Sequence, residues 1–221
     1  MEVIQVSLVQ SDRQVPDDSN RFLLMTAVPY SMSFTTATLL SHESILVAEL
    51  FAALGDWDET RRRVLDDNLL QMRTSNAAKR IFSEIASRLR QLTPEQMAYL
   101  LTAKRREQNY LLWLAYCQRY RFVYDFVVEV VAQKFRRLDF TLTYDAYDIF
   151  FNDKAEWHPE VARVAEATRK KQRQFLFKIM REAELLSEAG QITPVFLSPP
   201  LGRLIAAANP AHLAIFPGQT V

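Results

Sequence analysis

The chain has 221 residues, of which 49% are hydrophobic and 24% are charged, and its formal net charge is +1. At this length about 70% of the unfolded surface can be buried, so a core can form without disulfides or metals. The single cysteine, Cys117, excludes an intramolecular disulfide framework and a cysteine-based zinc site. The four glycines cannot form either of the glycine-rich phosphate-binding motifs.

The apolar stretches of the sequence are too short to cross a membrane, because a spanning helix needs about 20 mostly apolar residues. Residues 45–54 include Glu49, and residues 122–132 include Asp125 and Glu129. The N-terminus is acidic and lacks the basic start and apolar centre of a signal peptide. We therefore expect no membrane insertion and a cytoplasmic protein, in which a lone thiol stays reduced.

The first half of the chain contains clear helix boundaries. We interpret residues 1–29 as an N-terminal arm that could be flexible, and residues 3–9 within it could form a strand. The sequence then predicts helices at 41–54, from 57, from 74 or 75, and from 94. The boundary residues are Gly55 as a stop, and Asp56, Thr74 or Ser75, and Thr93 as caps.

The second half continues in the same way. The segment 107–138 is long, rich in aromatic residues and free of Gly and Pro. Its apolar residues follow one helical spacing before Tyr120 and another after it, which predicts two helices or one kinked helix. Further helices are predicted at 143–155, from Pro159, from a cap at Thr168 to near Gly190, and up to Ala208. The fold class is therefore all-α, a compact multi-helix domain with room for a small β element near Ile192 and Phe196. We expect an N-terminal helical domain at 30–140 and a C-terminal helical subdomain at 141–221.

The charge of the chain is concentrated in two basic blocks. Residues 61–106 hold 11 Lys or Arg and 4 Asp or Glu, a net charge of +7. Residues 161–182 hold 7 Lys or Arg and 2 Asp or Glu, a net charge of +5. Such asymmetry indicates an anionic partner such as nucleic acid, and the alternative is two solvated helix faces beside acidic neighbours.

The helix that starts at Thr168 carries the first candidate site. Its apolar arc is Phe175, Leu176, Ile179, Met180, Ala183 and Leu186. Its opposite face is expected to be exposed and to reach phosphates through Lys170, Arg173, Gln174, Lys178 and Arg181. Phe177 falls on this basic face in projection. The alternative is a solvated face with Phe177 packed on a neighbouring element.

The first basic block carries the second candidate site, whose DNA-binding candidates are Arg61, Arg62, Lys79, Arg90, Lys104 and Arg105. Arg80, Glu84 and Arg88 follow an i, i+4, i+8 spacing, so they could instead form a ladder of ion pairs. Arg88 lies near the apolar edge of its helix, and we interpret it as a structural residue.

The sequence offers no enzyme site. The three histidines are far apart, and Ser41, His42 and Glu43 are adjacent in a helix, where their side chains diverge. Asp145, Asp148 and Asp153 could gather a cation, but solvated acidic residues are far more common. We therefore expect no catalytic residue, no metal and no cofactor, and we expect Trp113, Tyr116, Cys117 and Phe126 to lie in the core.

Taken in order, several short segments resemble the BrxA family of bacterial BREX (bacteriophage exclusion) defence systems. The resemblance covers roughly residues 30–200 and rests on the ordered set of segments. In the first half these are Tyr30-Ser-Met-Ser-Phe-Thr, Glu43-Ser, Asp56-Trp57, Asn68-Leu-Leu-Gln-Met-Arg73-Thr74, Lys79-Arg80 and Glu84-Ile-Ala-Ser-Arg88-Leu89. In the second half they are Leu112-Trp113-Leu114-Ala115, Tyr120, Asp125-Phe126, Phe150-Phe151, Thr168-Arg169-Lys170, and Arg181-Glu182-Ala183 with Leu185-Leu186.

The resemblance implies a compact, all-helical fold like that of the antitermination factor NusB. It also implies a non-enzymatic protein that binds double-stranded DNA and works beside a methyltransferase, an ATPase and a phosphatase-like protein. The family offers no catalytic motif to carry over. A protein–protein adaptor of the BREX complex, with the segment 144–157 and Phe177 as its interface, is the alternative.

Overall fold

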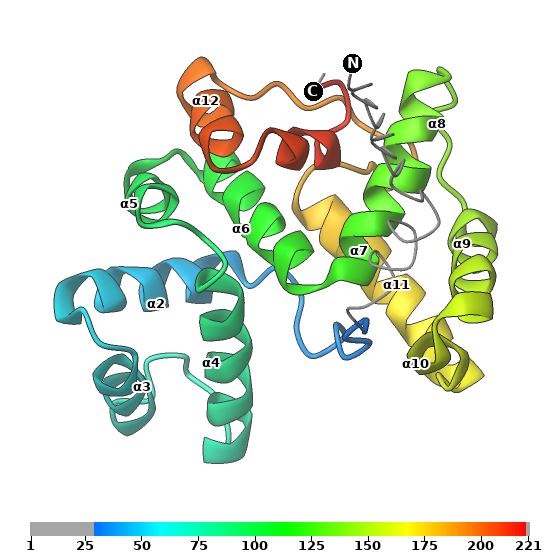
Figure 1. Ribbon diagram of the computed structural model, residues 1–221. Helices are drawn as coiled ribbons and strands as arrows, with labels where there is room; N and C mark the ends of the chain where they lie inside the picture. Colours follow the sequence, from blue (N-terminus) through cyan, green and yellow to red (C-terminus); the bar gives the residue numbers. More distant parts are fainter. Residues whose placement is uncertain (1–28, 220–221) are drawn as a thin grey trace, which may run out of the picture.

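A computed structural model describes residues 29–219, which fold almost entirely into helices (Figure 1). The α-helices are α2 (Ser41–Leu54), α3 (Trp57–Asp66), α4 (Ser75–Leu89), α5 (Pro94–Thr102), α6 (Arg105–Arg119), α7 (Arg121–Phe126), α8 (Ala132–Arg136), α9 (Tyr144–Trp157), α10 (Pro159–Ala162), α11 (Glu166–Glu182) and α12 (Pro199–Ala208). A π-helical segment, η1 (Val127–Val131), joins α7 to α8, and a 3₁₀ segment, η2 (Pro210–Ile215), follows α12. Over the described residues the chain is all-α, as predicted.

The predicted boundaries of the first helices are confirmed by their capping contacts. Gly55 ends α2 with a φ of 69°, and its N–H donates to the carbonyl of Phe51. The side chains of Asp56, Thr74 and Thr93 each accept the backbone N–H three residues later. Such side-chain caps satisfy N–H groups that lack a partner inside the helix, which is why local sequence reveals them.

The aromatic segment 107–138 is divided into two helices where the spacing of its apolar residues changes, as predicted. α6 ends at Arg119 and α7 begins at Arg121, with Tyr120 in a non-helical conformation between them. The π-helical segment that follows was not predicted. Hydrogen bonds in a π-helix join residues five apart, so this segment is wider than an α-helical turn.

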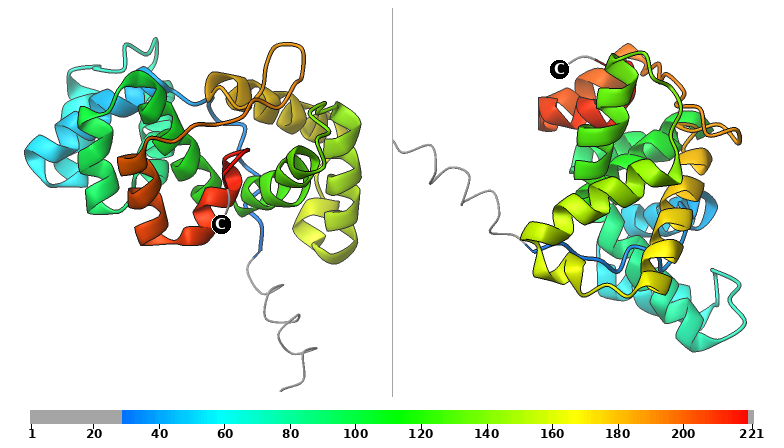
Figure 2. Two further views of the ribbon diagram at one scale, coloured as in Figure 1. Left: turned by 90° about the horizontal axis from the view of Figure 1, so that it is seen from above. Right: turned by 90° about the vertical axis from the view of Figure 1, so that its right-hand side faces the viewer.

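α6 lies at the centre of the fold and is buried along most of its length. It contacts α2, α4 and α5 on one side and α7, α11 and η2 on others (Figure 1). Trp113, Tyr116, Cys117 and Phe126 all have no exposed surface, as predicted. The two ends of the molecule lie on either side of α6, with α2–α5 at one end and α9–α10 at the other (Figure 2).

An extended segment at residues 29–40 connects these parts through hydrogen bonds that are buried or partly buried. The Tyr30 hydroxyl donates to Asp125 (2.7 Å), and the Tyr30 N–H donates to Glu160 (2.8 Å). Gln172 donates to the carbonyl of Met32 (2.6 Å), and the N–H of Leu39 donates to Glu182 (2.8 Å). The segment therefore connects α7, α10 and α11.

The organisation near the C-terminus differs from two expectations. α11 begins at Glu166 rather than at Thr168, and ends at Glu182 rather than near Gly190. The expected β element is reduced, within residues 29–219, to two isolated bridges that pair Thr141 with Gln191 and Leu186 with Ile192. Phe196 is exposed and belongs to neither bridge.

The proposed boundary near residue 140 falls in the loop between α8 and α9. Core residues from both sides of it contact one another, including Phe122 with Phe150 and Tyr110 with Phe216. The division into two parts stays a prediction. Our interpretation of residues 1–29 as an arm lies almost wholly outside the described residues.

Candidate nucleic-acid interface

Two of the predicted DNA-binding arginines line the same hollow between α3 and α4. Arg61 and Arg90 both line a hollow of about 190 Å³, together with Trp57, Asp58, Phe82, Ser83 and Ala86. The capped start of α3 at Asp56 fixes where Trp57 and Arg61 lie. A pair of exposed guanidinium groups on neighbouring helices is suited to phosphate oxygens, which Arg binds with two parallel N–H donors.

Arg90 is held in place by an aromatic stack. Its guanidinium lies 4.9 Å from the centre of the Trp57 ring, and Trp57 stacks on Phe51 at 4.0 Å. A cation over an aromatic ring is attracted by the ring quadrupole. This contact orients Arg90 without neutralising its charge.

The other cations of this block extend along α4 and onto the start of α6. Lys79 is four residues before Ser83 and so lies on the same side of α4. Lys104 is the N-cap of α6, and Arg105 is its first residue. All three are exposed, and neither they nor Arg61 and Arg90 form an ion pair with any residue between 29 and 219. Arg62 is exposed but pairs with Glu59.

The contacts of Arg88 confirm the prediction that it is a structural residue. It is 3% exposed and pairs with Glu84 at 2.7 Å, within α4. Its two terminal nitrogens donate to the carbonyls of Ala37 (2.8 Å) and Thr38 (2.6 Å). It therefore joins α4 to the extended segment and takes no part in the surface.

The prediction that α11 has an exposed basic face is wrong in part. Arg173 was expected to be exposed, but it pairs with Asp148 and lies 4.4 Å from the centre of the Tyr144 ring. Phe177 is buried and contacts the same ring edge-on at 4.8 Å. Arg181 is only 27% exposed and pairs with Glu188 at 3.4 Å. The physical reason for Arg173 and Phe177 is that this side of α11 packs on α9, and for Arg181 it is the loop that follows α11; the helix projection alone reveals neither.

The remaining face of α11 is exposed but largely neutralised. Lys170 pairs with Glu166 at 2.7 Å, and Lys178 lies 3.9 Å from Glu182. Gln174 lies between them on the exposed face. Each predicted cation of α11 thus has an acidic partner, whereas the cations of α3, α4 and the start of α6 mostly do not.

The acidic residues considered for a cation are engaged in other contacts or lie apart. Asp148 accepts from Arg169 at 2.8 Å as well as from Arg173. Among residues 29–219, no three His, Cys, Asp or Glu side chains are close enough to hold a metal ion. In the same part of the chain, every helix is too short or too polar to span a bilayer.

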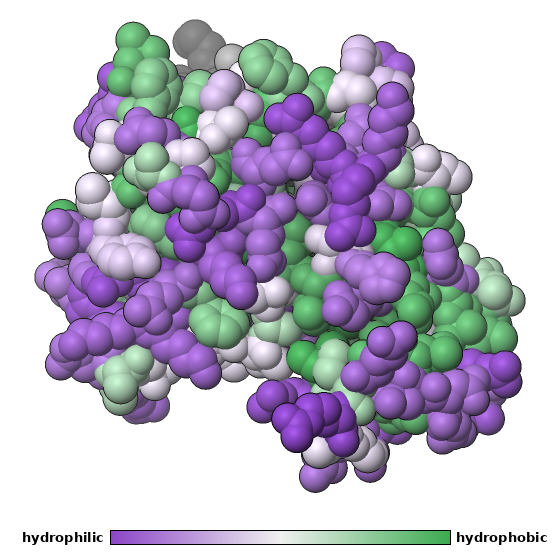
Figure 3. All heavy atoms as spheres, turned by 180° about the vertical axis from the view of Figure 1, so that it is seen from behind, coloured by the Kyte–Doolittle hydropathy of each residue, from purple (hydrophilic) through white to green (hydrophobic). Residues whose placement is uncertain are grey.

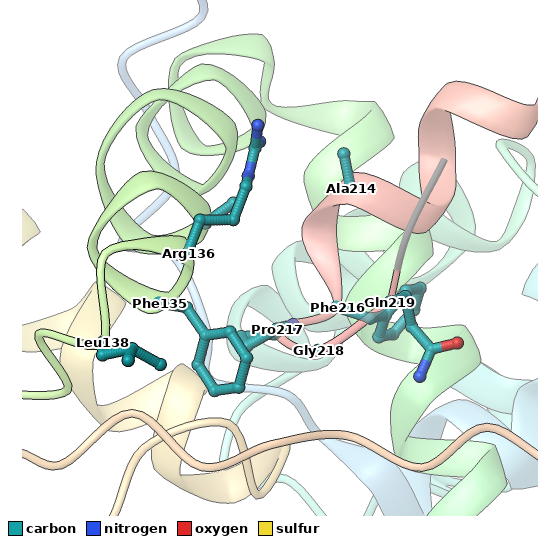
Figure 4. A pocket seen from close by; sticks show the side chains of 9 residues that line it. Phe135, Arg136, Leu138, Ala214, Phe216, Pro217, Gly218 and Gln219 are labelled. Atoms are coloured by element: carbon teal, nitrogen blue, oxygen red, sulfur yellow. The ribbon is translucent and has the colours of Figure 1, made fainter.

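A second hollow, of about 440 Å³, lies between α8 and the segment after η2 (Figure 4). Its lining combines α8 with the segment after η2 and is largely apolar, with Phe135, Leu138, Phe216 and Pro217. Gly218 has a φ of 93°, and a side chain there would meet the Phe135 ring at 3.6 Å. None of the predicted site residues lines this hollow.

The fold and the exposed cations define, over the described residues, an all-helical protein with unpaired basic residues on α3, around α4 and at the start of α6. A model of the BrxA family matches residues 28–209, and the chain belongs to that family. BREX protein BrxA of Escherichia coli O9:H4 (strain HS) is 29% identical over 145 residues, which cover 66% of this chain and 68% of the relative. A crystal structure of an uncharacterized protein from Magnetospirillum magneticum shares the fold, with a TM-score of 0.74 and 19% identity. This alignment covers 86% of this chain and all of the other.

Proposed function

We propose that this chain is a non-enzymatic component of a BREX phage-defence system that binds double-stranded DNA, mainly through its phosphates. The observation that supports this proposal is that five of the predicted contact residues are exposed and form no ion pair with any residue between 29 and 219, namely Arg61, Lys79, Arg90, Lys104 and Arg105. Cations without acidic partners retain their full charge for phosphate, and phosphate contacts dominate the affinity of proteins for DNA.

The spacing of these cations suits a DNA backbone. Lys79 and Arg90 are 11 residues apart on and just after α4, which corresponds to about 16 Å along the helix. One strand of duplex DNA carries a phosphate every 3.4 Å or so along the axis, so this span matches about five phosphates. We do not assign a base-reading role to any side chain, and we expect weak sequence preference.

The test compares two triple variants that lose the same charge. The first replaces Arg61, Lys79 and Lys104 by Gln, and it leaves Arg90 in its aromatic contact. The second, a control matched in charge, replaces Lys170, Lys171 and Lys178 of α11 by Gln; Lys170 and Lys178 have acidic partners, and Lys171 lies 5.6 Å from the centre of the Phe175 ring. All six residues are exposed, so we expect both variants to fold with nearly unchanged stability, because exposed ion pairs contribute only about 0–1 kcal/mol.

The measurement is the affinity for duplex DNA across a salt series. We expect the first variant to bind at least tenfold more weakly, with a salt slope reduced by about 2.7 for three lost phosphate contacts. The control should bind like the parent protein. If only the control variant loses DNA affinity, the interface lies on α11 and not on the first basic block. If neither variant loses affinity, the proposal is refuted for both basic blocks.

An adaptor that docks other BREX subunits without contacting DNA is the second candidate. It is favoured by two large apolar side chains of α9 that are exposed, Ile149 and Trp157. The same titration separates the two functions, since an adaptor of this kind would show no DNA affinity even at low salt.

A further inference from the structure

The C-terminal end of helix α2 is apolar and exposed. From Ile45 to Leu54 the helix contains a single charged residue, Glu49; Ile45, Leu46 and Leu50 pack partly buried against the core, whereas Ala52, Ala53 and Leu54 are exposed. Contiguous exposed apolar surface is a mark of protein contact sites, unlike apolar side chains that are exposed singly. Seen from behind, hydrophobic residues gather over this end of the molecule (Figure 3).

The exposed side of α2 continues into an apolar groove of about 420 Å³ between α2, α3 and α5. The lining residues are Phe51, Ala52, Trp57, Leu89, Arg90, Leu92, Pro94, Met97, Ala98 and Leu101. Arg90 is the single charged residue among them. The groove therefore suits an apolar side chain that is accompanied by a carboxylate.

The outer face of α9 has this chemistry. Ile149 is 62% exposed and Trp157 is 76% exposed, eight residues and so about 12 Å further along the helix. Asp153 and Glu156 fall on the same face, because they follow Ile149 by four and seven residues. Both are exposed and form no ion pair with any residue in the described part of the chain.

The groove and the outer face of α9 lie at opposite ends of the molecule (Figures 1 and 2). One copy therefore cannot fill its own groove with its own α9. We propose that the groove receives α9 of a second copy of this chain, with Trp157 and Ile149 inside it and Asp153 and Glu156 facing Arg90. Such a contact joins different surfaces of the two copies, so it leaves a free groove and a free α9 for further copies.

Charge favours this occupant over a symmetric pairing of two α2 helices. α2 carries Glu43 and Glu49 and no Lys or Arg, so two copies of it would bring like charges together. The α9 face brings carboxylates to an arginine instead. Trp is also one of the residue types that are enriched among those that dominate the binding energy of protein interfaces.

The experiment measures the mass of the full chain, free of DNA, by sedimentation velocity from about 1 µM to about 1 mM, a range that covers weak association. We expect the mass to rise with concentration. The face variant Ile149→Ala/Trp157→Ala should associate at least tenfold more weakly. The groove variant Ala52→Glu/Ala98→Glu should do the same, because it places carboxylates where Asp153 and Glu156 would approach. All four positions are exposed, and thermal unfolding checks that both variants fold.

Mixing the two variants gives the decisive measurement. One retains a groove and the other retains an α9 face, so the mixture should form dimers and nothing larger. The proposal is overturned if the parent chain stays monomeric throughout, or if the mixture does. It is also overturned if the groove variant alone loses association, which would indicate pairing through α2, or if neither variant loses it.

Discussion

The buried Arg88 makes a prediction about stability that can be worked from its contacts. Replacing Arg88 by Ala removes the donors to the Glu84 carboxylate and to the carbonyls of Ala37 and Thr38. Glu84 is 9% exposed and would keep only the hydroxyl of Tyr120, at 2.6 Å, as a side-chain partner. Breaking a buried ion pair in this way costs about 3–5 kcal/mol, because it leaves an uncompensated charge inside the protein.

This loss is a large part of the 5–15 kcal/mol that stabilises a typical domain. For a chain of this length it corresponds to a fall in Tm of about 10 °C, at about 2–4 °C per kcal/mol. Urea unfolding followed by circular dichroism measures the free energy directly, and the slope m should stay unchanged.

The double variant Arg88→Met/Glu84→Gln separates charge from packing. Because it removes the orphaned carboxylate, it should recover a substantial part of the loss seen in Arg88→Ala. A cost below about 1 kcal/mol for Arg88→Ala, the level of an exposed ion pair, would refute the reasoning. So would a double variant that is less stable than Arg88→Ala.

Three further outcomes are expected. If four to six cations contact phosphate, DNA affinity should fall about a hundredfold or more between 50 and 200 mM salt, whereas a salt-independent affinity would contradict phosphate binding. Burial raises the pKa of the Cys117 thiol well above its ordinary value, so a thiol reagent should label Cys117 only at the rate of unfolding, and rapid labelling of the native protein would contradict its burial. Burial lowers the pKa of His212 below its ordinary 6.5, so the unfolded chain takes up the proton first. The stability that His212 contributes is present above about pH 6.5 and falls as the pH drops through its lower folded pKa. His212→Gln should flatten this fall in acid unfolding curves, and an unchanged curve would exclude His212 as its cause.

Much of the fold could be predicted because helix ends are encoded locally. Thr93, Pro94 and Gln96 form a complete capping box within four residues, and Gly55 supplies the left-handed conformation that ends α2. The π-helical segment has no comparable signal, since Val127–Val131 reads as ordinary apolar helix. Thr168 is a good capping residue by type, yet α11 starts two residues earlier without a side-chain cap.

The candidate site was only partly predictable because exposure depends on distant residues. Arg173 and Phe177 look like members of a solvated face until α9 is placed beside them through Tyr144 and Asp148. The sequence does contain a partial indication of this contact, because Arg169 and Arg173 are one helical turn apart and could reach the same acidic residue. Nothing local indicates that Arg61 and Arg90 line the same hollow, since that depends on how α3 packs on α4.

The π-helical turn between α7 and α8 has a consequence for how relatives should be aligned. Such a turn holds one residue more than the α-helical turn it replaces, so it shifts everything after it by one position, or about 100° of rotation. In this chain the shift carries Phe135 to its place against Gly218. A relative that lacks the extra residue needs its aromatic side chain one position earlier to fill the same space. A one-residue gap within 127–131 and a displaced aromatic residue should therefore occur together in alignments of the family.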